Sequence, residues 1–198
     1  MGLLEFGQRN VALNDSRLGA AASAKMGAHE SVHKKVTSLF VETINMRKTR
    51  RVVNINVQGK KYARTAVYSV GREKIREFAH AVKSSNPVNF DVFAAQTAGY
   101  ADLVAPPTFA VVVQERSLAT VLADPEADID FSRVVHGDQR FVHVRPIVAG
   151  DELTSELTVA SVKTLGAHSM VTFETQIFDE TGALVCTAIS TLVVRGDE

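Results

Sequence analysis

The stretch that decides the fold is PPTFAVVVQERSLATVL, residues 106–122. Two prolines and a threonine open it, and proline suits the first turn of a helix because it has no N–H to leave unpaired. Residues 109–122 are apolar nearly all round, apart from Gln114, Glu115 and Arg116. Because a helix of this kind has to be buried, the stretch predicts a central helix that the rest of the domain covers.

The segments that follow predict the sheet that covers this helix. Residues 133–145, 152–163, 168–178 and 183–195 read as strands, separated by turns at 146–151, Gly166 and 179–182. The last turn, Asp-Glu-Thr-Gly, is typical of a hairpin. We expect an α+β domain in which four long antiparallel strands curve around the central helix. Such a sheet leaves an edge at which a second chain can pair.

The segment before the central helix predicts a short strand and two helices. Residues 67–70 read as the strand. Apolar residues then recur at the i, i+3, i+4, i+7 spacing of an amphipathic helix: Ile75, Phe78, Ala79 and Val82. In the loop 84–90, Pro87 disfavours helical geometry for the residue before it. Asp91 is suited to cap a second helix over 92–98, which a glycine ends.

Charge is balanced over the whole chain but not along it. The 198 residues carry 22 Lys plus Arg and 22 Asp plus Glu. Residues 1–61 hold 11 basic and 4 acidic side chains, whereas residues 62–198 hold 11 basic and 18 acidic ones. We expect residues 1–59 to be a basic, disordered extension and residues 60–198 to be a single domain. The mildly acidic domain argues against nucleic acid or anionic membrane as a partner.

The basic extension does not fit a targeting sequence. Residues 2–6 lack the charge and the apolar length of a secretory signal, and Phe6 stands where a myristoylation motif needs Ser or Thr. Its acidic residues make it a poor organellar transit peptide, and a start at Met46 is an open alternative. No apolar run is long enough to span a membrane, and Cys186 is the single cysteine. We expect a cytoplasmic, reducing location.

Several motifs resemble one enzyme family. After a buried helix, FVHVRPIVAGDEL at residues 141–153 resembles the hot-dog fold. The runs YSVGREKIREFA at 68–79, GYADLVAPPTF at 99–109 and DQRF at 138–141 are similar to MaoC-like (3R)-hydroxyacyl-ACP dehydratases. Within that family they most resemble accessory subunits of the mycobacterial-type heterodimeric dehydratase of type II fatty acid synthesis. The resemblance implies a curved antiparallel sheet around a long central helix, and dehydration of a 3-hydroxyacyl thioester to a trans-2-enoyl thioester without a cofactor.

The same resemblance implies that the catalytic groups are missing here. Dehydration needs a base for the C2 proton, an acid for the leaving hydroxyl and donors for the thioester oxygen. Active members carry Asp-x-Asn-Pro-x-His and a glycine N–H at the start of the central helix. In residues 84–89, Asn86 is kept, but Ser84 and Asn89 replace the Asp and the His. The glycine position falls on Pro107, which has no N–H. We expect no catalytic residue in this chain and a partner hot-dog subunit, or a second copy, beside it.

The resemblance further implies that an accessory chain lines part of the acyl channel and contacts an acyl-ACP or acyl-CoA thioester. Candidate wall residues, each also explained as plain core, are Asn86, Phe90, Tyr100, Thr108, Phe109, Val112, Val113, Leu118 and Val121. Acyl carrier protein is acidic and its pantetheine arm carries a phosphate, so arginines are candidates for docking it by charge complementarity. These are Arg116, Arg133, Arg140 and Arg145.

Other reactive residues have simpler explanations. His136 and Asp138 would share a face of a regular strand and could form a relocated acid–base pair, although a strand-end hydrogen bond also explains them. We interpret His143 as a partly buried, hydrogen-bonded histidine and Cys186 as a structural thiol. No spacing of metal ligands is present. Two rival hypotheses remain: a non-enzymatic homodimer that binds acyl-CoA, and a self-sufficient hydratase that uses His136 and Asp138.

Overall fold

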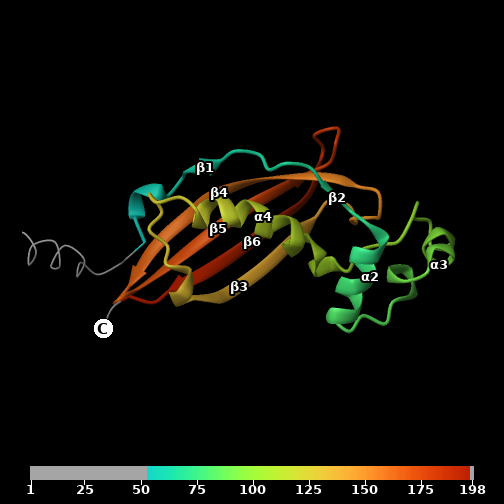
Figure 1. Cartoon of the computed structure of the whole chain (residues 1–198), viewed down its shortest axis with the longest axis horizontal. Coiled ribbons are helices and arrows are strands. Elements are labelled where there is room, and N and C mark those ends of the chain that lie inside the picture. Colours follow the sequence, from blue (N-terminus) through green and yellow to red (C-terminus); the bar gives the residue numbers. More distant parts are fainter. Residues whose placement is uncertain (1–52, 197–198) are drawn as a thin grey trace, which may run out of the picture. The chain divides into compact units, whose positions relative to one another are not determined.

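The computed structural model describes residues 53–196, and within them one antiparallel sheet of six strands and a set of helices (Figure 1). The strands are β1 (Lys61–Tyr62), β2 (Tyr68–Ser69), β3 (Val134–His143), β4 (Glu152–Leu165), β5 (His168–Phe178) and β6 (Leu184–Val194). Their order is β1-β4-β5-β6-β3, and β2 also pairs with β4. The α-helices are α2 (Arg72–Ala81), α3 (Val92–Thr97) and α4 (Ala110–Leu122). Short 3-10 turns lie at Ile55–Val57, Pro87–Asn89, Pro107–Phe109 and Phe131–Arg133.

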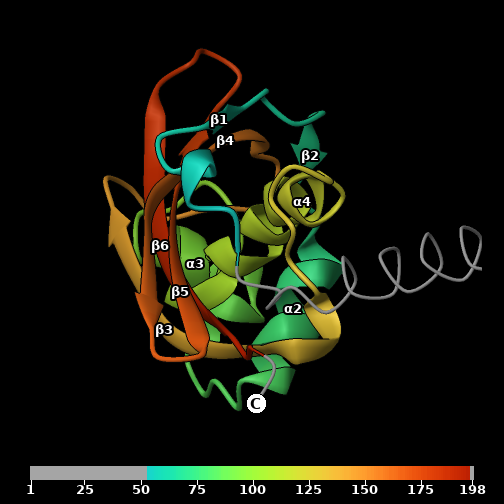
Figure 2. The same ribbon diagram turned by 90° about the vertical axis from the view of Figure 1, so that its left-hand side faces the viewer.

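The central helix α4 lies along one face of the sheet, which curves around it (Figures 1 and 2). It contacts β4, β5, β6 and β1. The predicted α+β architecture of a sheet wrapped around one helix is therefore confirmed. One detail of the helix differs from the expectation: Glu115 and Arg116 face solvent, but Gln114 is buried. Its amide can be buried because partners on several strands meet it under the helix.

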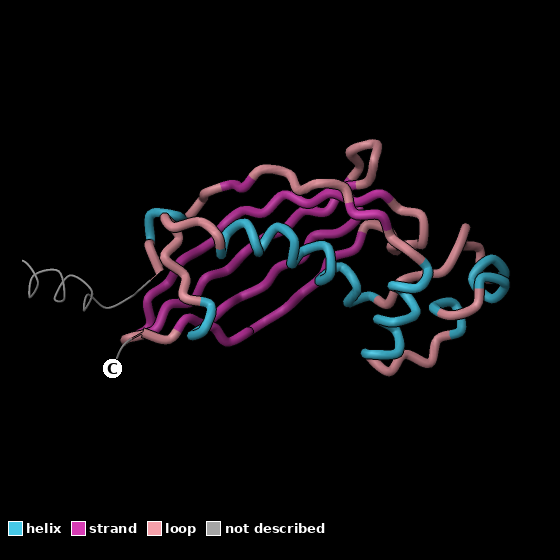
Figure 3. Tube along the Cα trace, viewed as in Figure 1, coloured by secondary structure: helices cyan, strands magenta, loops and turns pink. Residues whose placement is uncertain are grey.

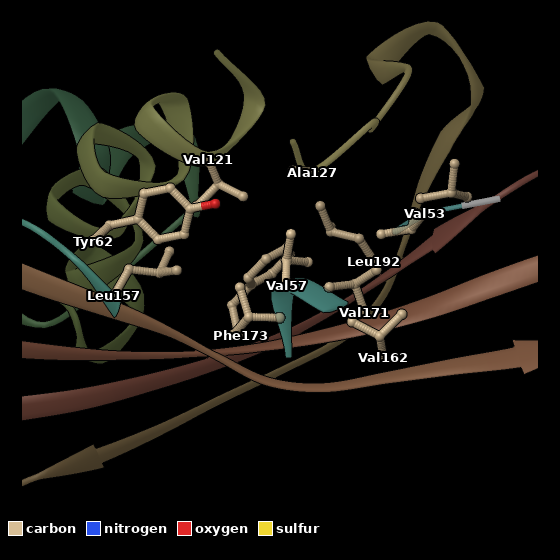
Figure 4. Packing of buried hydrophobic residues seen from close by; sticks show 12 residues of the cluster. Val53, Val57, Tyr62, Val121, Ala127, Leu157, Val162, Val171, Phe173 and Leu192 are labelled. Atoms are coloured by element: carbon tan, nitrogen blue, oxygen red, sulfur yellow. The ribbon is translucent and has the colours of Figure 1, made fainter. Parts of the chain in front are cut away.

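The core consists of two apolar clusters along α4. The first lies toward the start of the helix and includes Phe109, Val113, Ile147, Leu153 and Ile177. The second lies toward its end and joins Val121 to residues of the long strands, as Figure 4 shows for residues that include Leu157, Val162, Val171, Phe173 and Leu192. These side chains come from the helix and from the strands, and their burial holds the sheet against the helix.

The folded domain begins earlier than residue 60, the boundary expected from the sequence. Val53 and Val57 are each only 3% exposed and belong to the second cluster. The Gly59 N–H donates to the carbonyl of Val159 at 2.8 Å, and the short strand β1, which the sequence did not predict, follows at once. This segment is too short and too polar to show a period of its own. The remaining residues 1–52 of the expected extension, including the alternative start at Met46, lie outside the described residues.

Helices α2 and α3 lie beyond the start of α4, at one end of the sheet (Figure 3). Phe78 of α2 packs its ring edge-on against Phe109, with centroids 5.3 Å apart. The guanidinium of Arg72 binds both carboxylate oxygens of Asp102, and these hydrogen bonds hold the pKa of Asp102 below its usual range. Asp91 caps α3 as expected, by accepting from the Phe93 N–H at 2.8 Å. These contacts fix the loops that frame the start of α4.

Strand β3 forms one edge of the sheet. Within the described residues its only strand neighbour is β6. Val142 and Val144, at its end and just beyond it, are 51% and 67% exposed. An edge strand with unpaired backbone groups and exposed apolar side chains is a surface on which another strand can add.

Candidate functional site

A pocket of about 450 Å³ opens at the start of α4. Three segments line it: residues 84–89 of the loop after α2, residues 104–107 before the helix, and residues 143–147 at the end of β3, together with Tyr100. The pocket is within the size range of small-ligand sites. The three positions that the resemblance marks as vacant, Ser84, Asn89 and Pro107, all lie in its wall.

Ser84 and Asn89 meet in this wall, although neither carries acid–base chemistry near neutral pH. The Ser84 hydroxyl donates to Asn89 Oδ1 at 2.6 Å, and Asn89 Nδ2 donates to the carbonyl of Val104 at 2.6 Å. Asn86, also in the wall, caps the Pro87–Asn89 turn by accepting from the Val88 N–H. Asn89 is only 3% exposed. The loop is therefore held by a closed set of hydrogen bonds at the place where a proton-transfer pair would stand.

His143 contributes the imidazole of the pocket. Its Nε2 lies 2.8 Å from the carbonyl oxygen of Pro107, so the Nε2–H donates to that carbonyl. The expected hydrogen bond is present, but the side chain is exposed rather than partly buried, because β3 is an edge strand. The carbonyl of Pro107 is thus already hydrogen-bonded, and Pro107 has no backbone N–H to donate into the pocket. This arrangement does not make an oxyanion hole.

Cys186 lies behind His143, with its Sγ 3.9 Å from the imidazole Nε2. The residue is fully buried, and burial raises the pKa of its thiol to about 11. A thiol with such a pKa stays protonated near neutral pH and is a poor nucleophile. Cys186 therefore acts as part of the first apolar cluster.

Arg145 is tied to carboxylates of its own chain. Its guanidinium donates to Asp151 at 2.8 Å and to Asp179 at 3.3 Å. The hydrogen bond to Asp151 is the main cause that raises the pKa of Arg145. Asp151 also accepts from the Val148 N–H at 2.9 Å, so the trio fixes the turn into β4. Arg145 lines the pocket but is engaged in holding its wall.

The other predicted docking arginines lie on different surfaces. Arg116 is on the exposed side of α4, over the ring of Tyr68 at 5.6 Å. Arg140 is exposed on β3, on the face opposite to Phe141, whose side chain packs against the first cluster. Arg133 ends the 3-10 turn before β3. Only Arg145 of the four lines the pocket.

Of the residues predicted to line the acyl channel, some line the pocket and the others do not. Tyr100 and Asn86 line the pocket. Phe109, Val113 and Val121 are fully buried in the core. The other four lie outside the pocket wall. Val112 is half-buried against the first cluster and Leu118 against the second. Thr108 is exposed, and the carbonyl of Phe90 accepts a hydrogen bond from Arg76. The pocket therefore reaches the start of the helix, and the apolar interior beyond it is closely packed.

A relocated acid–base pair on β3 is not supported. A β-bulge shifts the register so that His136 pairs with Leu192 while Asp138 pairs with Thr191. Paired residues share a face, and neighbours on β6 alternate, so the bulge places His136 and Asp138 on opposite faces. Neither lines the pocket. The expectation from a regular strand fails because Gly137 adds one residue to β3.

Within residues 53–196, no group of three or more His, Cys, Asp and Glu side chains gathers to hold a metal ion. The same part of the chain contains no helix long and apolar enough to cross a membrane.

The fold and the pocket define a hot-dog domain of the MaoC-like dehydratase class. Residues 56–188 match the family described as the FAS1-like dehydratase domain region, and the chain belongs to this family.

The chain is also similar to individual proteins. A UPF0336 protein from Leifsonia xyli subsp. xyli is 65% identical over 146 residues, which are 74% of this chain and 98% of that protein. A UPF0336 protein from Streptomyces griseus is 48% identical over 140 residues, 71% of this chain and 93% of its own length. A chain of the C-terminally truncated HadBC complex of Mycobacterium tuberculosis, a (3R)-hydroxyacyl-ACP dehydratase, is 32% identical with a TM-score of 0.62, covering 71% of this chain and 99% of that one.

Proposed function

We propose that this chain is the accessory subunit of a hot-dog (3R)-hydroxyacyl-thioester dehydratase of fatty acid elongation. It completes the sheet of a partner hot-dog chain and forms part of the substrate-binding surface. The partner supplies both proton-transfer groups through an intact Asp-x-Asn-Pro-x-His motif. The base of the partner removes the C2 proton, and its acid protonates the departing hydroxyl as water forms.

One observation carries this proposal: the positions that correspond to the Asp and His of the family motif hold Ser84 and Asn89, which line the pocket and are bonded to each other at 2.6 Å. The wall also holds His143 and Arg145, which are engaged by Pro107 and by Asp151, and the phenol of Tyr100. Loss of one oxyanion-hole donor alone lowers the rate by about 10²–10³. These facts support a chain that depends on a partner for chemistry.

The kind of partner follows from the edge of the sheet. Within residues 53–196, β3 pairs with a strand on one side only, and it presents the exposed apolar side chains of Val142 and Val144. The similarity to a chain of the HadBC complex supports a hot-dog chain as the partner. The acyl thioester is expected to arrive on acyl carrier protein or coenzyme A.

Hydration of crotonyl-CoA, the reverse reaction, tests the proposal. We expect the purified chain alone to be inactive and a complex with a co-expressed hot-dog chain carrying Asp-x-Asn-Pro-x-His to be active. The matched control is His136→Gln with Asp138→Asn in this chain, which should leave the activity of the complex unchanged. Turnover by the chain alone would refute the accessory role. Inactivity in both, together with tight binding of acyl-CoA by a homodimer, would favour the non-enzymatic alternative.

A further inference from the structure

A row of buried polar side chains crosses the interior beneath the middle of α4. It consists of Gln114 and Ser117 of the helix, Ser155 of β4, Thr175 of β5, Ser190 of β6 and Gln139 of β3. Apart from the half-buried Gln139, each member is at most 2% exposed. We call these six residues the polar row. Every long strand of the sheet contributes one member.

Hydrogen bonds join the polar row around Gln114. Its Nε2 donates to Ser190 Oγ at 3.2 Å, and its Oε1 accepts from Gln139 Nε2 at 3.0 Å. Gln139 and Ser190 are direct neighbours in the register of β3 and β6. On the other side, the Ser117 hydroxyl donates to the Gln114 carbonyl at 2.9 Å and lies 3.3 Å from Ser155 Oγ. The helix and the strands are thus tied to each other through polar atoms at this level.

The polar row lies between the two apolar clusters. Along the chain, Phe109 and Val113 of the first cluster precede Gln114, and Val121 of the second follows Ser117. The pocket adjoins the first cluster only, because Ala105 and Ile147 belong to both its wall and that cluster. An apolar group that enters from the pocket therefore meets apolar side chains first and the polar row next.

We propose that the polar row is the length stop of the acyl-binding interior, with Gln114 as the specificity-determining residue; this inference rests on the proposed acyl-thioester function. While an alkyl tail displaces Phe109 or Val113, one apolar contact replaces another. A tail that advances past Gln114 has to separate it from Ser190 or Gln139 and leave buried polar groups unpaired. One such unpaired group weakens binding about tenfold, which corresponds to about 1.4 kcal/mol. Short and medium acyl chains are accepted and long ones are rejected.

Acyl-CoA binding measured by calorimetry tests the stop, on the full chain alone and on its complex with the catalytic hot-dog partner. The probes are butyryl-, octanoyl- and hexadecanoyl-CoA. We expect the wild type to bind octanoyl-CoA at least tenfold more tightly than hexadecanoyl-CoA. Gln114→Met combined with Gln139→Met removes both amides. Ser190 Oγ then lacks its Gln114 donor with or without a bound acyl chain, so the preference should fall to less than threefold. The matched control is Thr120→Met, on the exposed side of α4, which should keep the wild-type preference.

The outcomes separate this inference from the proposed function. Equal binding of octanoyl- and hexadecanoyl-CoA by the wild type would overturn the length stop and leave the accessory role intact. A double variant that folds, as judged by its thermal unfolding, and still rejects the long chain would also overturn it. If the double variant does not fold, Gln114→Glu serves, because a carboxylate should reject long chains more strongly; an unchanged preference would contradict the stop. Failure of every probe to bind in both preparations would overturn the acyl-binding role together with the stop.

Discussion

Replacement of Asn89 by alanine is the sharpest test of how the loop at residues 84–89 is held. The side chain is 3% exposed and makes two hydrogen bonds of 2.6 Å, to the Val104 carbonyl and from the Ser84 hydroxyl. Each bond contributes about 0.5–1.5 kcal/mol, and a buried carbonyl left without its donor adds to the loss. We therefore expect Asn89→Ala to lower the free energy of unfolding by about 2–3 kcal/mol.

Urea denaturation of the single and double variants measures this effect. Ser84→Ala removes only one of the two bonds and should lower the free energy of unfolding by about 1 kcal/mol. The double variant should be less destabilised than the sum of the two, because the shared bond is lost only once. Asn86→Ala is the matched control, since Asn86 is an exposed cap of the same loop. If Asn89→Ala destabilises no more than this control, or if the two sites are additive, the reasoning is refuted.

Three further predictions concern other parts of the domain. The hydrogen bond from Lys60 is the main cause that holds the pKa of Asp124 at about 2, so this carboxylate stabilises the fold fully above about pH 4 and loses its effect as the pH falls toward 2. Asp124→Asn should therefore reduce the change of the unfolding free energy with pH over that range. An unchanged pH dependence, measured by urea denaturation at each pH, would contradict this. Val142→Lys with Val144→Lys should abolish the complex with a hot-dog partner in light scattering while the isolated chain keeps its unfolding temperature; an intact complex would exclude this edge as the interface. Arg145→Gln should lower the free energy of unfolding by about 1–2 kcal/mol, because its partners lose a half-buried cation; unchanged stability with a loss of acyl carrier affinity would instead assign it to docking.

The elements that were predicted correctly are those whose signal is local. The helix over Ala110–Leu122 follows from its continuous apolar sequence and the prolines before it, and β5 and β6 follow from two apolar runs around an Asp-Glu-Thr-Gly turn. The resemblance singled out Ser84 and Asn89, and their hydrogen bond is local as well, since only four residues of a tight loop lie between them. Periodicity and turn chemistry act over a few residues, so one sequence is enough to read them.

The features that were missed depend on contacts between distant residues. Ser155 stands between Leu153 and Leu157 at inward positions of β4, and this polar residue in an apolar alternation was the available signal for the polar row. Ser155 alone could not reveal that the side chain of Gln114 extends from α4 toward the sheet at the same level. Nor could it reveal that Gln114 bonds to Ser190 of β6, which is 76 residues away.

The sequence by itself determined the fold class and the family, and it predicted that Ser84 and Asn89 replace the acid–base pair, because each of these is written in residue types and short spacings. Only the tertiary structure decided that Val53 and Val57 belong to the core, that a bulge separates His136 from Asp138, and that His143 meets the Pro107 carbonyl. The physical reason is that burial, register and hydrogen-bond partners are properties of pairs of segments. A segment acquires them only when the sheet closes around α4.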